Sequence, residues 1–220
     1  MKNNKRSFPP TVCDSPYHAQ DQESGGPSGS FEEMTYQYLL HEQKTILVNS
    51  DINGSLIERL VIPIILLNKK DDEREASEKG FDRNDEPISL LINSNGGLAH
   101  EVLSAVSVIM NSKTPVHTYA LGRAMSGGFY LLISGHRRFA QPFSTVCYHQ
   151  IQGASPSGPA QTGVEYLAES YRLQSAFEAM IHKRTKIKKK KLEDVNTKKI
   201  DWYFSQEELI NLGIVDDFSF

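Results

Sequence analysis

Short apolar runs alternate along the chain with stretches in which apolar residues recur at helical spacing. Apolar, β-branched runs at residues 45–48, 88–92 and 116–121 predict buried strands. Helical spacing predicts helices over 31–43, over about 54–67, from Leu98 to the stop at Pro115, and directly after Ser126. This alternation predicts an α/β fold with mostly parallel strands and right-handed crossovers.

The second half of the chain continues with shorter strands and a longer helix. The predicted elements are strands at 138–140 and 145–148, a Gly/Pro/Ser-rich loop at 153–163, a long helix at 164–185 and a short helix at 192–200. A last helix begins at Ser205, where Glu208 completes a capping-box pattern, and 214–216 is a predicted terminal strand. In the helix over about 54–67, Pro63 predicts a kink or a shifted boundary.

Composition divides the chain into an arm and one domain. Residues 1–30 are rich in Ser, Gly, Pro and Asn, which predicts a flexible N-terminal arm. Residues 31–220 are sufficient for a single domain with a sizeable core. Within that domain, residues 68–86 are dense in Lys, Asp and Glu, which predicts a solvated surface loop or a helix extension.

Charge and cysteine usage exclude several classes of function. The 24 Lys and Arg nearly balance the 27 Asp and Glu, so nucleic acid is not the expected main partner. Seven of the nine residues in 183–191 are basic, a run that we interpret as a solvated helix end rather than a nucleic-acid or membrane patch. Cys13 and Cys147 are far apart, which indicates neither a metal site nor a disulfide scaffold. The absence of a long apolar run predicts a soluble, cytoplasmic protein without a membrane segment.

Ser126 lies between a predicted strand and a predicted buried helix. The N-terminus of a helix offers free backbone N–H groups, and the neighbouring Gly127 and Gly128 would let a substrate backbone come close. A nucleophilic serine with an oxyanion donor fits this place, although an ordinary Gly/Ser turn fits it as well.

A second glycine turn, Gly96-Gly97, ends the preceding strand. Because the ends of parallel strands meet at one edge of a sheet, the N–H groups of Gly97 and Gly127 could form an oxyanion hole. His149 is the best-placed base of the seven histidines, since it ends a strand and opens a glycine-rich loop. For the orienting acid, the spacing leaves Asp194, Asp201 and Asp216 open.

Five segments, in order, resemble the proteolytic subunit of the Clp protease (ClpP), a self-compartmentalised serine peptidase of the crotonase-like superfamily. The segments are Ile92-Asn93-Ser94-Asn95-Gly96-Gly97, Gly122-Arg123-Ala124-Met125-Ser126-Gly127-Gly128, Tyr148-His149-Gln150, Asp201-Trp202-Tyr203-Phe204-Ser205 and Leu212-Gly213-Ile214-Val215-Asp216. The resemblance implies Ser126 as nucleophile, His149 as base and Asp201 as orienting acid. It places Gly97 and Gly127 at the oxyanion-hole positions, with no metal or cofactor bound by this chain.

The resemblance also implies an assembly. It predicts the repeated ββα spiral core of the ClpP/crotonase-like fold, with a long helix at 164–185 that protrudes for ring–ring contact. Family members form heptameric rings, stacked in pairs as a tetradecamer around a proteolytic chamber. An AAA+ Clp ATPase uses ATP to thread unfolded polypeptides into that chamber.

Several positions depart from the family pattern. Asn95 and Ile151 stand where the motifs have proline, and Gly127 stands where methionine follows the nucleophile. Ile200 replaces an arginine that pairs across the rings. Residues 88–92 lack the tyrosines that line the unfoldase-docking pockets, so loss of ATPase docking is a hypothesis.

Other functions remain open. The chain could be a ClpP-like peptidase that works without an ATPase, or a structural ring subunit without activity. A crotonase-type acyl-CoA enzyme would have no use for Ser126, His149 and Asp201 in this order. A Ser-Lys peptidase would need a lysine near the pocket, and none stands out.

Overall fold

The computed structural model describes residues 31–153 and 159–218 and contains one central sheet of six strands. The strands are β1 (Thr45–Val48), β2 (Ile88–Ser94), β3 (Val116–Met125), β4 (Arg137–Ala140), β5 (Thr145–Tyr148) and β6 (Trp202–Tyr203). Their order is β1-β2-β3-β5-β6, with β4 also paired to β3. Only the β5–β6 pair is antiparallel among these strands, which confirms the predicted α/β fold with mostly parallel strands.

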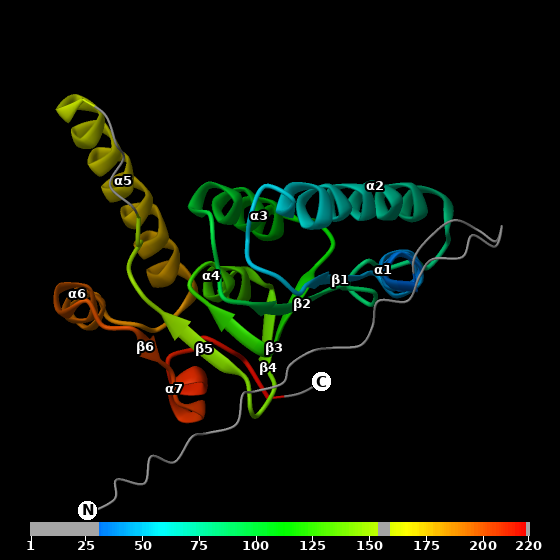
Figure 1. Ribbon diagram of the computed structural model, residues 1–220. Coiled ribbons are helices and arrows are strands. Elements are labelled where there is room, and N and C mark those ends of the chain that lie inside the picture. The colour runs from blue at the N-terminus through cyan, green and yellow to red at the C-terminus, as the bar shows by residue number, and fades with distance from the viewer. Residues whose placement is uncertain (1–30, 154–158, 219–220) are drawn as a thin grey trace, which may run out of the picture.

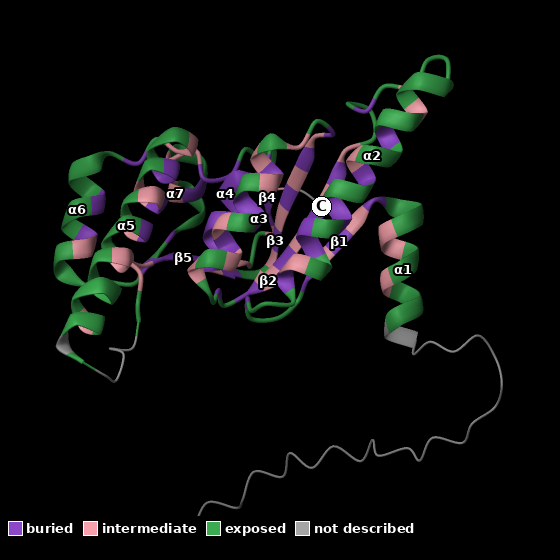
Figure 2. Cartoon of the chain, turned by 90° about the horizontal axis from the view of Figure 1, so that it is seen from above, coloured by how far each residue is buried: buried purple, intermediate pink, exposed green. Residues whose placement is uncertain are grey.

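The helices lie around this sheet and at its two ends. They are α1 (Phe31–Gln43), the π-helical segment η1 (Ile57–Val61), α2 (Ile62–Ser77), α3 (Ala99–Asn111), α4 (Gly127–Ser134), α5 (Ala160–Arg184), α6 (Lys189–Lys198) and α7 (Gln206–Asn211). Helix α1 lies beside β1 at one end, whereas α5 projects from the other end, near α6 and α7 (Figures 1 and 2). Among the described residues, no helix is long and apolar enough to cross a bilayer.

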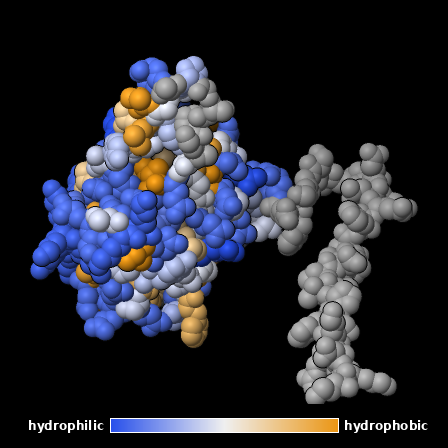
Figure 3. All heavy atoms as spheres, turned by 60° about the vertical axis from the view of Figure 1, so that its left-hand side comes forward, coloured by the Kyte–Doolittle hydropathy of each residue, from blue (hydrophilic) through white to orange (hydrophobic). Residues whose placement is uncertain are grey.

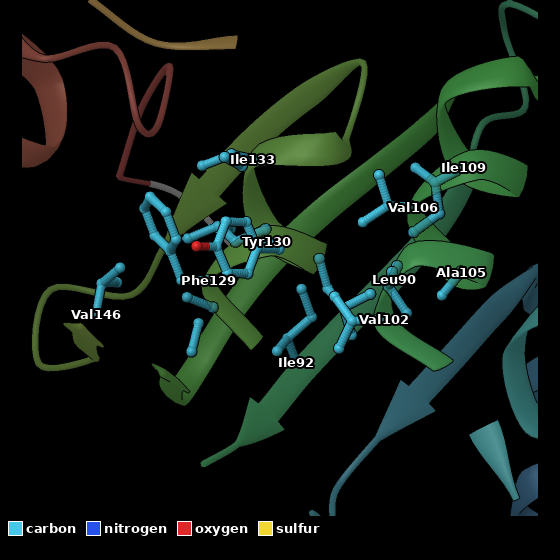
Figure 4. Close-up of a cluster of buried hydrophobic side chains, with 14 of the residues drawn as sticks. Leu90, Ile92, Val102, Ala105, Val106, Ile109, Phe129, Tyr130, Ile133 and Val146 are labelled. Atoms are coloured by element: carbon cyan, nitrogen blue, oxygen red, sulfur yellow. The ribbon is translucent and has the colours of Figure 1, made fainter. Parts of the chain in front are cut away.

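The hydrophobic core lies between the sheet and helices α3 and α4. Leu90 and Ile92 of β2 face Val102 and Ile109 of α3 (Figure 4). Every residue of α4 is buried, because the sheet, α3 and the base of α5 surround it. The predicted buried helix after Ser126 is therefore confirmed, and it holds the turn before it in place.

Pro63 shifts the start of α2, as the sequence predicts. The π-helical turn η1 ends directly before α2, which has proline in its first turn. An ordinary helix would pair the Arg59 carbonyl with the N–H that Pro63 lacks. The Tyr36 hydroxyl of α1 donates to that carbonyl instead, at 3.0 Å.

The charged stretch 68–86 begins as a helix extension, because α2 continues to Ser77. The expectation that this stretch is wholly solvated is wrong at Asp71, which is fully buried. The Asp71 carboxylate accepts from Lys44 Nζ at 2.7 Å and from Thr114 Oγ1 at 2.6 Å. These contacts tie α2 to the start of β1 and to the loop before β3.

Three elements in the C-terminal part differ from the sequence predictions. Residues 214–216 do not form a strand: an isolated bridge joins Phe139 to Asp217, and the Arg138 side chain binds the Asp216 carboxylate and the Gly213 carbonyl. Strand β6 was not predicted. Helix α5 also starts at Ala160, inside the predicted loop 153–163, of which residues 154–158 lie outside the described part. The predicted arm, residues 1–30, lies outside it as well.

Only part of the basic run at 183–191 is solvated. Its six lysines are exposed, in agreement with the prediction. Arg184 is half-buried and donates to the carbonyls of Ile133 and Gly135 at the end of α4. That arginine therefore fastens the base of α5 to the helix that follows Ser126.

Candidate active site

Ser126 forms a sharp turn between β3 and α4. Its φ of 52° and ψ of −116° lie in a region that L-residues other than glycine rarely occupy. The sequence predicts that this strand ends at residue 121. Strand β3 instead continues through Gly122 to Met125, so the turn before α4 is shorter than predicted. The turn leaves Ser126 half-buried at the N-terminus of α4.

The Gly96-Gly97 turn after β2 packs directly against Ser126. Ile52 holds this turn with its backbone: its N–H donates to the Gly96 carbonyl at 2.7 Å, and its carbonyl accepts from Leu98 N–H at 3.0 Å. Gly96 has a φ of 102°, and a Cβ atom there would lie 2.6 Å from both Ser126 Cβ and Gly127 N. Only glycine fits between the two turns.

The two amides predicted for the oxyanion hole are available. Within the described residues, neither Gly97 N–H nor Gly127 N–H donates a hydrogen bond to a protein group. Gly127 is the first residue of α4, so its N–H has no partner in the helix. The structure thus brings two free donors to adjoining turns, and their role as an oxyanion hole stays a prediction.

His149 follows β5, and a hydrogen bond of its Nδ1 atom indicates which tautomer the ring adopts. Its Nδ1 atom lies 2.6 Å from the Gln150 carbonyl oxygen. A carbonyl can only accept, so Nδ1 carries the hydrogen and Nε2 of the neutral ring is left as an acceptor. This is the tautomer that a general base for a serine hydroxyl requires.

Asp201 directly precedes β6. In the antiparallel β5–β6 ladder, Cys147 pairs with Tyr203 and Tyr148 pairs with Trp202. One position beyond this ladder, the same register leads to His149 and Asp201, neither of which belongs to a strand. Burial raises the pKa of the Cys147 thiol to about 11, and the nearby Asp201 charge contributes to that shift.

Ser126, His149 and Asp201 therefore lie at one edge of the sheet, at the ends of the adjoining strands β3, β5 and β6. The Ser126 N–H also donates to the Cys147 carbonyl at 3.0 Å. Among these three described residues, no hydrogen bond joins the hydroxyl, the imidazole and the carboxylate. Their assignment as a catalytic triad stays a prediction.

The other candidate acids have partners elsewhere. Asp194 binds Lys198 Nζ at 2.8 Å on α6, and Asp216 binds Arg138 at 2.7 Å. Among the described residues, no group of three His, Cys, Asp or Glu side chains could hold a metal ion.

A polar network that the sequence analysis did not anticipate lies beside the two turns. Arg123 Nη1 donates to Asn95 Oδ1 at 3.1 Å, and Asn95 Nδ2 donates to Asp51 Oδ1 at 3.0 Å. Arg123 comes three residues before Ser126, and Asn95 directly precedes Gly96. The network therefore joins the two turns through side chains, which spacing along the chain does not reveal.

Comparison with known proteins identifies the family. A model of the Clp protease family matches residues 28–219. The chain belongs to the Clp protease family. Its central mixed sheet and surrounding helices have the ClpP/crotonase-like fold, which confirms the resemblance.

Curated proteins of the Clp protease family match over most of their length. The ATP-dependent Clp protease proteolytic subunit 1 of Mycobacterium leprae is 27% identical over 207 residues, which are 90% of this chain and 92% of that protein. The ATP-dependent Clp protease proteolytic subunit of Deinococcus radiodurans is 27% identical over 187 residues, 82% of each chain. The proteolytic subunit 1 of Mycobacterium tuberculosis is 26% identical over 204 residues, 89% of this chain and 91% of that protein. This chain is a divergent, ClpP-like member of the family.

Proposed function

We propose that this chain is a serine endopeptidase of the Clp type that uses Ser126, His149 and Asp201. The observation that carries the proposal is the strained backbone of Ser126, which holds the serine at a helix N-terminus and against the Gly96-Gly97 turn. Strain of this kind persists where the surrounding structure enforces it, and it clusters at active sites. The tautomer of His149 and the register of Asp201 support the same assignment.

The reaction is an acyl transfer. Ser126 Oγ attacks the peptide carbonyl while His149 Nε2 takes its proton, and the amides of Gly97 and Gly127 bind the oxyanion. His149 then protonates the leaving amine, and water hydrolyses the acyl-enzyme by the same route. For this cycle His149 Nδ1–H must exchange the Gln150 carbonyl for the Asp201 carboxylate, a local rotation next to β6.

We further propose that the active chain is oligomeric, in heptameric rings stacked as a tetradecamer. Helix α5 projects from the body and carries exposed apolar side chains (Figures 1 and 3). The large apolar residues exposed on the described part of this helix are Val164, Tyr166, Leu167 and Tyr171. An apolar surface of this kind marks a contact with another protein, and a second copy of α5 is the partner that we propose.

The substrates in this proposal are unfolded polypeptides, which an AAA+ Clp ATPase delivers at the expense of ATP. The names of the relatives, all ATP-dependent proteolytic subunits, support this partnership. The composition of β2 favours a second candidate, a peptidase that works without an ATPase, because residues 88–92 contain no tyrosine. Degradation of casein separates the two: it needs an unfoldase and ATP under the first proposal and proceeds without them under the second.

The test of the chemistry is hydrolysis of fluorogenic peptides by the full chain and three variants. Ser126→Ala, His149→Ala and Asp201→Asn should each lower kcat by about 10³-fold or more, and the double variants should lose little beyond the single ones. Asp194→Asn is the matched control, since Asp194 binds Lys198 on α6 and should be neutral. Full activity of Ser126→Ala, or equal losses for Asp194→Asn and Asp201→Asn, would refute the triad. A wild-type chain without any activity would favour a structural ring subunit.

A further inference from the structure

A closed ring of hydrogen bonds lies at the base of α5 and includes Tyr148, the residue directly before His149. Gln174 Nε2 donates to Tyr148 Oη at 3.2 Å and to Glu178 Oε1 at 2.9 Å. Asn196 Nδ2 donates to the same Glu178 oxygen at 2.8 Å, and Tyr148 Oη donates to Asn196 Oδ1 at 2.7 Å. The ring joins β5, α5 and α6 around the buried Tyr148.

The orientation of the Gln174 amide is fixed by a further contact. Gln174 Oε1 accepts from the backbone N–H of Ile151 at 2.8 Å. Because a backbone N–H can only donate, the amide oxygen must face Ile151 and the NH₂ group must face Tyr148 and Glu178. Each polar atom of the Gln174 side chain is used, and a flipped amide would lose the contacts with Ile151 N–H and with the Glu178 carboxylate.

These contacts enclose the segment that carries the predicted base. Gln174 binds the side chain of Tyr148 on one side of His149 and the backbone of Ile151 on the other. The same ring includes Asn196 of α6, five residues before Asp201. One side-chain ring therefore fixes both the segment with the base and the helix that leads to the acid.

The hydrogen bond between Gln174 and Ile151 involves a position at which this chain departs from the family motif. The motif has proline at this position, and proline has no N–H to donate. A rigid proline would restrict the backbone after His149 without any partner. In this chain, a hydrogen bond to α5 restrains the same backbone.

We propose that Gln174 is a positioning residue that sets the placement of His149 relative to Asp201. The proposal rests on the proposed function of these two residues and adds a residue outside the triad. Within the described residues, Gln174 makes no hydrogen bond to either of them and acts through Tyr148, Ile151 and Asn196. Its expected effect is on the chemical step, because it orients the base and makes no hydrogen bond to the Ser126 turn or to the glycine amides of the described part.

The test compares Gln174→Ala with Ser175→Ala in the full-length protein, by peptide hydrolysis and by native mass spectrometry. Ser175 is exposed, and within the described residues its hydroxyl bonds only to the Tyr171 carbonyl of its own helix, so it is the matched control. We expect Gln174→Ala to lower kcat about 10- to 100-fold with KM nearly unchanged, since misplacement of a catalytic group costs rate rather than binding. Asn196→Ala opens the ring from α6 and should give the same pattern. The double variant Ile151→Pro/Gln174→Ala should regain part of the lost kcat.

Unchanged kcat in both Gln174→Ala and Asn196→Ala, or a loss of equal size in Ser175→Ala, would overturn the proposal. A loss without rescue by Ile151→Pro would also count against it, because a general loss of folding or assembly would not respond to that proline. Failure of the proposed function is a separate result, in which the wild-type chain itself does not respond to Ser126→Ala.

Discussion

The backbone N–H of Ser126 donates a 3.0 Å hydrogen bond to the carbonyl of Cys147. Cys147 lies two residues before His149, so the predicted nucleophile is attached to the strand that leads to the predicted base. The same strand pairs with β6, which follows Asp201. Backbone hydrogen bonds thus help to bring three distant parts of the chain to one edge of the sheet.

The close contact between the glycine turns predicts a sharp effect of Gly96→Ala. A Cβ at Gly96 would lie 2.6 Å from Ser126 Cβ and from Gly127 N, at a φ of 102°. We expect this variant to lower kcat/KM at least about 100-fold, because the nucleophile and one oxyanion donor must move. Gly54→Ala is the control, since a Cβ at Gly54 would have no atom within 4 Å. Equal activity of the two variants in peptide hydrolysis would contradict the proposed arrangement.

The chemistry of Cys147 predicts that this thiol is inert. Burial, with a contribution from Asp201, raises its pKa to about 11, so only about 0.1% is thiolate at pH 8, against about 10% for a thiol of pKa 9. Iodoacetamide should leave Cys147 unmodified and peptide hydrolysis unchanged, as peptide mapping of the folded protein can show. Rapid alkylation at pH 8 with loss of activity would mean that the site is open and that the thiol is ionised.

The pair Asn95 and Arg123 predicts a small coupling between the two turns. Removal of either side chain breaks the 3.1 Å contact that joins them. A double-mutant cycle of Asn95→Ala and Arg123→Ala on kcat/KM should give a coupling of about 0.5–1 kcal/mol, a two- to fivefold effect, because the pair is exposed. Additive effects would show that the contact does not stabilise the turns.

Two positions at which the family motifs have proline are thus restrained here by hydrogen bonds. Asn95 binds Asp51 and Arg123 with its side chain, and Ile151 binds Gln174 with its backbone. In both places the restraint comes from other elements of the fold.

The buried Asp71 predicts a large effect on stability. Asp71 is fully buried against Lys44, which is itself buried, so Asp71→Ala leaves a buried ammonium without its closest partner. We expect a loss of about 3–5 kcal/mol in the free energy of unfolding, measured by urea denaturation. Glu73→Ala, an exposed change on the same helix, should lie within about 0.5 kcal/mol of the wild type. A similar midpoint for Asp71→Ala and Glu73→Ala would show that the ion pair contributes little.

Local patterns predicted most of the fold and part of the candidate site. The runs of apolar residues predicted β1 and β5 at their observed bounds. The Ser205–Glu208 capping box is also present as predicted. Local patterns also indicated Ser126 and the glycine turns, because a strand, a small-residue turn and a helix are close along the chain. They left Asp201 open, since its place depends on the β5–β6 register, a contact between segments more than 50 residues apart. Asp71 and Gln174 were missed for the same reason: their partners lie on other elements.

The most direct test of the central claim is a fluorophosphonate probe that reacts with activated serine hydroxyls, with the labelled residue identified by mass spectrometry of the full-length protein. The proposed triad predicts one adduct, on Ser126, which is lost in Ser126→Ala and strongly reduced in His149→Ala. The Asp194→Asn control should be labelled like the wild type. An adduct on another serine, or labelling of Ser126 that does not depend on His149, would contradict it.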